Sequence, residues 1–150
     1  MTVFTYCVVL AGVIGFQIAL IFGAPWGRLT QGGANEGPLP TKGRVLAGVS
    51  ILILIGMGGA ALSTAGNWPN WPVWTVWPAL AVQALSCLAN WVTPSKPERR
   101  LWGPITTGML VLLIAVAFFC PPMFFLVEIH SGGPGAGCTR RIAARQRGET

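Results

Sequence analysis

The apolar and polar positions of the chain fall into long alternating blocks. Four long stretches contain no charged side chain, and the segments between them are rich in glycine, proline or basic residues. A helix of about 20 apolar residues spans the hydrocarbon core of a bilayer. The pattern therefore predicts transmembrane helices at residues 3–22, 45–62, 73–92 and 102–120.

The composition is that of a membrane protein. Of the 150 residues, 53% are hydrophobic and 9% are charged, and the mean hydropathy is +0.62. A soluble domain carries about 25% charged residues, and a chain this short cannot hide so much apolar surface from water. We expect an all-α polytopic membrane protein: a bundle of four transmembrane helices within residues 1–128, followed by a flexible Gly/Arg-rich tail at residues 129–150.

The positive charge lies outside the apolar stretches. The formal net charge is +6, and all ten Lys and Arg residues lie between the predicted helices or after the last one. This distribution is typical of membrane proteins and argues against nucleic acid as a partner. The first and third connections share one side and hold six basic residues, against four arginines in the remote tail. We expect these connections in the cytoplasm and both termini outside it.

Small residues recur at multiples of four in the first two predicted helices. They are Ala11, Gly15 and Ala19 in the first, and Gly48, Gly56 and Ala60 in the second. Small residues on one face let helix backbones approach closely in a bilayer, so we expect the two helices to pack along these faces. The alternative is that Gly and Ala are simply common in membrane helices.

Three amide side chains lie inside the predicted helices: Gln17, Gln83 and Asn90. Their expected depths overlap, so we predict a hydrogen bond from Gln17 to Gln83 or Asn90, which would hold helices together. The functional alternative is a polar path for a neutral solute. None of the four stretches contains an ionisable Asp, Glu, Lys, Arg or His, which argues against proton-coupled transport.

Tryptophan marks the expected membrane boundaries. Trp68, Trp71, Trp74 and Trp77 recur every three residues at the start of the third predicted helix. Trp26 and Trp102 lie at the ends of other helices. Because indole rings favour the headgroup region, we expect all six to be interfacial anchors.

The two basic connections form a candidate site for lipid or another anion. Its residues are Arg28, Gly32, Gly33, Lys42, Arg44, Lys96, Arg99 and Arg100. Flexible glycine amides beside arginines can bind an anion, and basic residues attract anionic lipid headgroups. The alternative is that these charges only fix the orientation of the chain.

Catalytic chemistry has little support in the sequence. The four cysteines form no C-x-x-C pair, and a single histidine without a carboxylate cluster cannot supply the usual metal ligands. We therefore expect no enzyme activity, no metal and no cofactor.

Two loop motifs carry a resemblance. Gly23-Ala24-Pro25-Trp26-Gly27 is followed by Gly32-Gly33, Leu39-Pro40 and Arg44. Ser95-x-x-Glu98-Arg99-Arg100-Leu101-Trp102-Gly103-Pro104 comes before the last predicted helix. With these motifs the chain resembles a family of small bacterial four-helix integral membrane proteins without an assigned activity. The resemblance implies a location in the bacterial inner membrane.

Together these features predict a structural or accessory membrane protein that binds lipid, another membrane protein or a second copy of itself. The alternative function is a small facilitator or channel for a neutral solute, lined by the three amide side chains.

Overall fold

The computed structural model describes residues 1–119, which form a helical bundle with no strand among them. The long helices are α1 (Thr2–Ile21), α2 (Thr41–Thr64), α3 (Val76–Val92) and α4 (Lys96–Phe119). Short 3₁₀ turns are η1 (Gly27–Leu29), η2 (Gln31–Gly33) and η3 (Val73–Thr75). All four helices, with η3 continuing into α3, are long and apolar enough to cross a membrane. The predicted fold class is confirmed, and the chain is a multi-pass membrane protein. The predicted tail at 129–150 lies outside the described residues.

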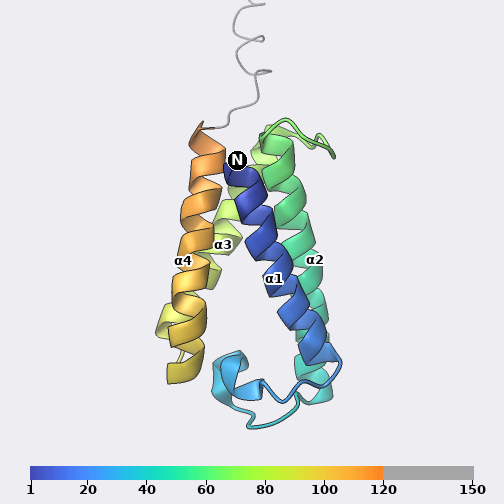
Figure 1. Cartoon of the computed structure of the whole chain (residues 1–150), viewed down its shortest axis with the longest axis vertical. Coiled ribbons are helices and arrows are strands. Elements are labelled where there is room, and N and C mark those ends of the chain that lie inside the picture. Colours follow the sequence, from blue (N-terminus) through green and yellow to red (C-terminus); the bar gives the residue numbers. More distant parts are fainter. Residues whose placement is uncertain (120–150) are drawn as a thin grey trace, which may run out of the picture.

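The helices are arranged as two antiparallel pairs. α1 packs mainly on α2, and α3 packs mainly on α4. The pairs meet near the N-terminus and lie farther apart toward the α1–α2 connection, which covers that end of the bundle (Figure 1). We call this end, which carries the α1–α2 connection and the first turns of α2 and α4, the loop end.

Two helices begin earlier than hydropathy predicts. α2 starts at Thr41 instead of 45, and α4 starts at Lys96 instead of 102. Lys, Arg and Glu are good helix formers, so a helix continues through the polar interface where apolar character ends. Ser95 begins α4, because its carbonyl oxygen accepts from the Arg99 amide (3.0 Å) and its hydroxyl accepts from the Glu98 amide (3.4 Å).

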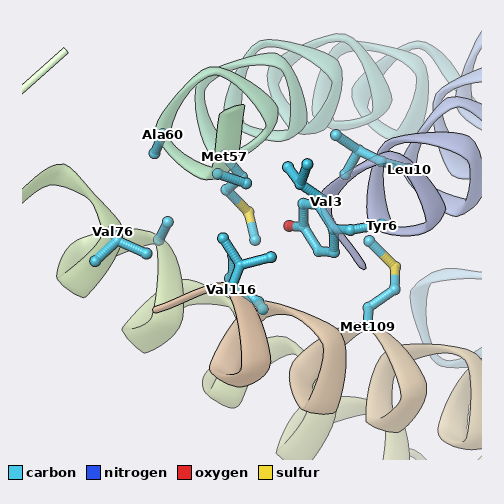
Figure 2. Close-up of a cluster of buried hydrophobic side chains, with 11 residues drawn as sticks. Val3, Tyr6, Leu10, Met57, Ala60, Val76, Met109 and Val116 are labelled. Carbon is cyan, nitrogen blue, oxygen red and sulfur yellow. The ribbon is translucent and has the colours of Figure 1, made fainter. Parts of the chain in front are cut away.

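The core occupies the end of the bundle near the N-terminus. Its buried side chains come from all four long helices, and Tyr6, Leu113 and Val116 are fully enclosed. Figure 2 shows the Tyr6 hydroxyl facing apolar side chains, among them Met57 and Val116. This hydroxyl is the one buried side-chain polar atom within residues 1–119 that has no hydrogen-bond partner.

The predicted small-residue faces are wrong as the contact between α1 and α2. Ala11 and Gly15 are exposed, Ala19 and Gly48 are half-buried, and a Cβ added at Gly15, Gly48 or Gly56 would meet nothing. The close approach is at Gly58 instead, where a Cβ would lie 2.8 Å from the Leu10 side chain. Of the six predicted residues, Ala60 alone is buried in the core. The four-residue spacing identifies a face of small residues. The two helices nevertheless pack through another face, which carries larger apolar side chains such as Leu10 and Met57.

The tryptophan run lies at the opposite end of the bundle from the loop end. Trp68, Trp74 and Trp77 are exposed, as interfacial anchors require. The Trp71 ring packs against Gly59, so closely that a Cβ there would lie 2.8 Å from the ring. The backbone N–H of Trp71 donates to the Ser63 hydroxyl (3.0 Å). The role of the exposed rings as anchors stays a prediction.

We predict that Tyr6→Phe stabilises the protein by about 1 kcal/mol, because it keeps the ring and removes a buried hydroxyl that has no partner. Thermal unfolding of the purified protein in detergent measures the change. The control is Thr64→Val, which removes a buried hydroxyl that donates to the Ala60 carbonyl oxygen (2.8 Å). Because this hydroxyl has a partner, the control variant should not be more stable than wild type. A less stable Tyr6→Phe protein would contradict the prediction.

Candidate functional site

A cavity of about 210 Å³ lies between the four long helices, and its wall combines apolar and polar side chains. Each helix contributes to its wall, and its polar side chains include Gln17, Ser50, Gln83, Ser86, Asn90 and Thr106. At about 30 Å³ per water molecule, this volume suits a few waters or one small solute. All three amides predicted to lie within the membrane therefore face one space.

The cavity lies between the core and the loop end. Met57 and Met109 belong both to the core and to the cavity wall, so they form its apolar boundary. Thr30, between η1 and η2, lines the cavity on the loop side. The position coincides with the part of the bundle where the two helix pairs diverge (Figure 1).

The predicted hydrogen bond between the amides is wrong. Gln83 donates from Nε2 to the Thr106 carbonyl oxygen (3.1 Å), and Asn90 donates from Nδ2 to the Ser86 carbonyl oxygen (2.7 Å). Among residues 1–119, Gln17 has no hydrogen-bond partner for its side chain. The divergence of the helix pairs separates α1 from α3 at this depth, so the amides share a cavity instead of a bond.

Glu98 also lines the cavity, although the hydropathy pattern places it outside the predicted helices. It lies in the first turn of α4, its side chain lines the cavity, and the residue is only 8% exposed. Carboxylate atom Oε2 accepts a hydrogen bond from the Thr93 hydroxyl (3.0 Å). The Ser95-x-x-Glu98 spacing matches a helix-capping motif, and this signal could have placed Glu98 inside the last helix.

The α1–α2 connection is fastened to the start of α4. The Trp102 indole donates from Nε1 to the Leu29 carbonyl oxygen (2.7 Å), and the Ser95 hydroxyl donates to the Arg28 carbonyl oxygen (3.0 Å). Gly33 has a φ of +71°, and a Cβ there would lie 2.7 Å from the Ser95 hydroxyl oxygen. Only glycine fits this close approach without strain.

Aromatic stacking adds to this fastening. Phe16 of α1 stacks on Trp26 with ring centroids 5.5 Å apart, and its other contact is edge-to-face with Trp102 at 4.7 Å. Phe16 and Trp102 both line the cavity. The two tryptophans predicted as anchors at this end therefore also hold the loop against α1 and α4.

The predicted basic site is assembled at the loop end, but its glycines do not form an open anion site. The Gly33 amide donates to the Thr30 carbonyl oxygen (2.9 Å), and Gly32 lies against Pro94. Arg28 forms a salt bridge with Glu36, and Arg44 donates from Nε to the Leu39 carbonyl oxygen (3.0 Å). Lys42, Lys96 and Arg100 are exposed there, Arg99 is half-buried, and none of the four side chains bonds to another residue within 1–119.

No group of three or more metal-binding side chains occurs within residues 1–119, and the described cysteines, Cys7 and Cys87, are unpaired. Comparison of the chain with protein-family models, curated proteins and solved structures found no match. The resemblance suggested by the loop motifs stays a prediction, and the geometry of the cavity carries the functional argument.

We predict that Trp102→Phe loosens the α1–α2 connection, because the ring remains but the hydrogen bond to Leu29 is lost. Loss of about 1 kcal/mol of local stability raises cleavage of the opened loop about fivefold. Limited trypsin digestion of the purified protein, followed at Arg28, measures this rate. Trp77→Phe, whose ring contacts Phe118 at the other end, serves as the control and leaves the rate unchanged. Equal rates for both variants would contradict the prediction.

Proposed function

We propose that the protein is a small facilitator that binds a hydrogen-bonding solute in the cavity between its helices. The observation that supports this proposal is that Gln17 of α1 and Gln83 and Asn90 of α3 line one cavity of about 210 Å³. Polar groups without partners are costly in hydrocarbon, so the amide side chains in the cavity wall favour an occupant that supplies hydrogen bonds.

The shape of the cavity suggests how solute enters. The loop end is covered by the α1–α2 connection, whereas the opposite side is filled by the close-packed core around Tyr6 and Leu113. A solute therefore enters most easily past the loop. Passage to the other side requires the two helix pairs to separate at the core, a rigid-body movement of the kind seen in many gated proteins.

An accessory role is the second candidate. The exposed side chains of Lys42, Lys96 and Arg100 lie at the same end and suit anionic lipid headgroups. The exposed Ala11 and Gly15 leave a smooth face on α1 for another membrane protein or a second copy. This role does not need the cavity, so cavity variants distinguish the two candidates.

The proposed location is the bacterial inner membrane, with the loop end in the cytoplasm. Six basic residues lie at the loop end, and the N-terminus and the α2–α3 connection at the other end hold none. Basic residues next to transmembrane helices favour the cytoplasmic side.

We predict that Gln17→Leu lowers the flux of urea or glycerol into proteoliposomes about fivefold, because it removes a hydrogen-bonding partner worth about 1 kcal/mol from the cavity wall. Gln17 is the amide to change, since its side chain bonds to no other described residue and its loss should leave the fold intact. Stopped-flow light scattering measures the flux.

The control for this experiment is Asn67→Ala. Asn67 is also a half-buried amide, but it lies beyond the end of α2, away from the cavity, and donates to the Ala65 carbonyl oxygen. Its variant should transport at the wild-type rate. If liposomes with the wild-type protein show no flux above empty liposomes, or if Gln17→Leu transports at the wild-type rate, the proposal of a facilitator is wrong. The accessory role is then favoured.

Orientation gives a separate prediction. In intact spheroplasts, external protease should remove an epitope tag placed before Met1, whereas cleavage after Arg28 should require lysis. The basic loop end then lies inside the cell. Cleavage at Arg28 in intact spheroplasts would show the opposite orientation.

A further inference from the structure

Glu98 brings a carboxylate to the wall of the cavity. The residue is 8% exposed, and within the described residues its side chain has one hydrogen bond, in which Oε2 accepts from the Thr93 hydroxyl. Within residues 1–119 the sole salt bridge joins Arg28 to Glu36, so Glu98 has no cationic partner in the described chain. Buried charges in proteins are normally paired. A cation bound in the cavity would supply the positive charge that Glu98 lacks.

The groups around this carboxylate also suit a cation. The rings of Phe16 and Trp102 line the same cavity, and aromatic faces attract positive charge. The side-chain oxygens of Gln17 and Asn90 are acceptors, and no described residue donates to them. An organic cation with N–H groups could therefore contact a carboxylate, π faces and amide oxygens at once.

The basic residues of the loop end do not cancel this attraction. Five of them are exposed to solvent, where salt screens charges beyond about 8 Å: Arg28, Lys42, Arg44, Lys96 and Arg100. Arg99 is half-buried and forms no salt bridge with Glu98. Glu98 is enclosed by protein, where the effective dielectric constant is lower and a charge acts more strongly on a neighbour. The carboxylate thus dominates inside the cavity, while the exposed lysines and arginines act on the membrane surface.

We propose that the cavity selects a small organic cation of the guanidinium or ammonium class, with Glu98 as its specificity-determining residue. This inference rests on the proposed function and deepens it, because it changes the expected solute from neutral to positively charged. The prediction of a neutral solute depended on the absence of ionisable groups from the membrane helices, and the earlier start of α4 places Glu98 within one.

A purely structural role for Glu98 is the competing explanation, since the residue accepts from Thr93 and lies in the capping turn of α4. Glu98→Gln separates the two roles. The glutamine side chain has nearly the same shape and can still accept from Thr93 through its amide oxygen, but it carries no charge.

The test uses guanidinium and urea, a cation and a neutral molecule of nearly the same shape. The full chain in lipid nanodiscs is titrated with each at millimolar concentrations and constant ionic strength, and binding is measured by saturation-transfer NMR. Wild type is expected to bind guanidinium at least about tenfold more tightly than urea. Glu98→Gln should lose this preference and bind urea as wild type does. Glu36→Gln, which removes an exposed carboxylate at the same end, should keep the preference.

Each other outcome decides between the two proposals. If Glu98→Gln keeps the preference, or Glu36→Gln loses it equally, the cation inference is overturned. If wild type binds both probes equally and Gln17→Leu weakens both, the inference fails but the proposed function stands. If neither probe binds, both are overturned.

A second variant covers the case in which Glu98→Gln does not fold, as judged by circular dichroism. Gln17→Glu adds a carboxylate to the cavity wall at a side chain that bonds to no other described residue. It should raise the preference for guanidinium over urea further. An unchanged preference in a folded Gln17→Glu protein would count against charge recognition in the cavity.

Discussion

A bilayer offers no water to polar side chains, and this constraint arranges the whole bundle. Amide and hydroxyl groups within the helices must bond to protein or gather around a space that holds a polar occupant. Thr64 and Gln83 bond to backbone carbonyl oxygens. Gln17, which has no such partner among the described residues, faces the cavity. The cavity thus brings Gln17 together with Gln83 and Asn90, whose amides already donate to backbone carbonyl oxygens.

The two ends of the bundle meet this constraint differently. Near the N-terminus, four helices interdigitate apolar side chains, and among the buried polar side-chain atoms of residues 1–119 only the Tyr6 hydroxyl lacks a partner. At the loop end the helix pairs diverge, and the connection that covers them is held by directional bonds to Trp102 and Ser95. A few hydrogen bonds and ring contacts are easier to break than a packed core. The structure therefore places a segment held by a few directional contacts beside the cavity that the three amides line.

The sequence predicts the membrane helices well because a span needs only length and apolar character, and those are read directly from the chain. The start of α4 is misplaced because hydropathy marks where apolar residues begin and not where the hydrogen bonds of a helix begin. The capping pair Ser95 and Glu98 marks that second position. The sequence misjudges Gly15 and Gly56 because spacing identifies a face without telling which neighbour covers it. The cavity could not be predicted, since the distance between α1 and α3 at the depth of Gln17 depends on how the pairs diverge.

The first turns of α4 carry charges in two different environments. Basic side chains are exposed at the membrane surface, and one carboxylate lines the cavity. Lys96 and Arg100 are exposed and favour a cytoplasmic position for this end, whereas Glu98 in the same turns is buried and lines the cavity. Because these residues belong to one rigid helix, the depth at which the basic side chains meet the lipid headgroups also fixes the depth of the carboxylate. The rule that orients the protein in the membrane thereby positions the group that we propose selects its solute.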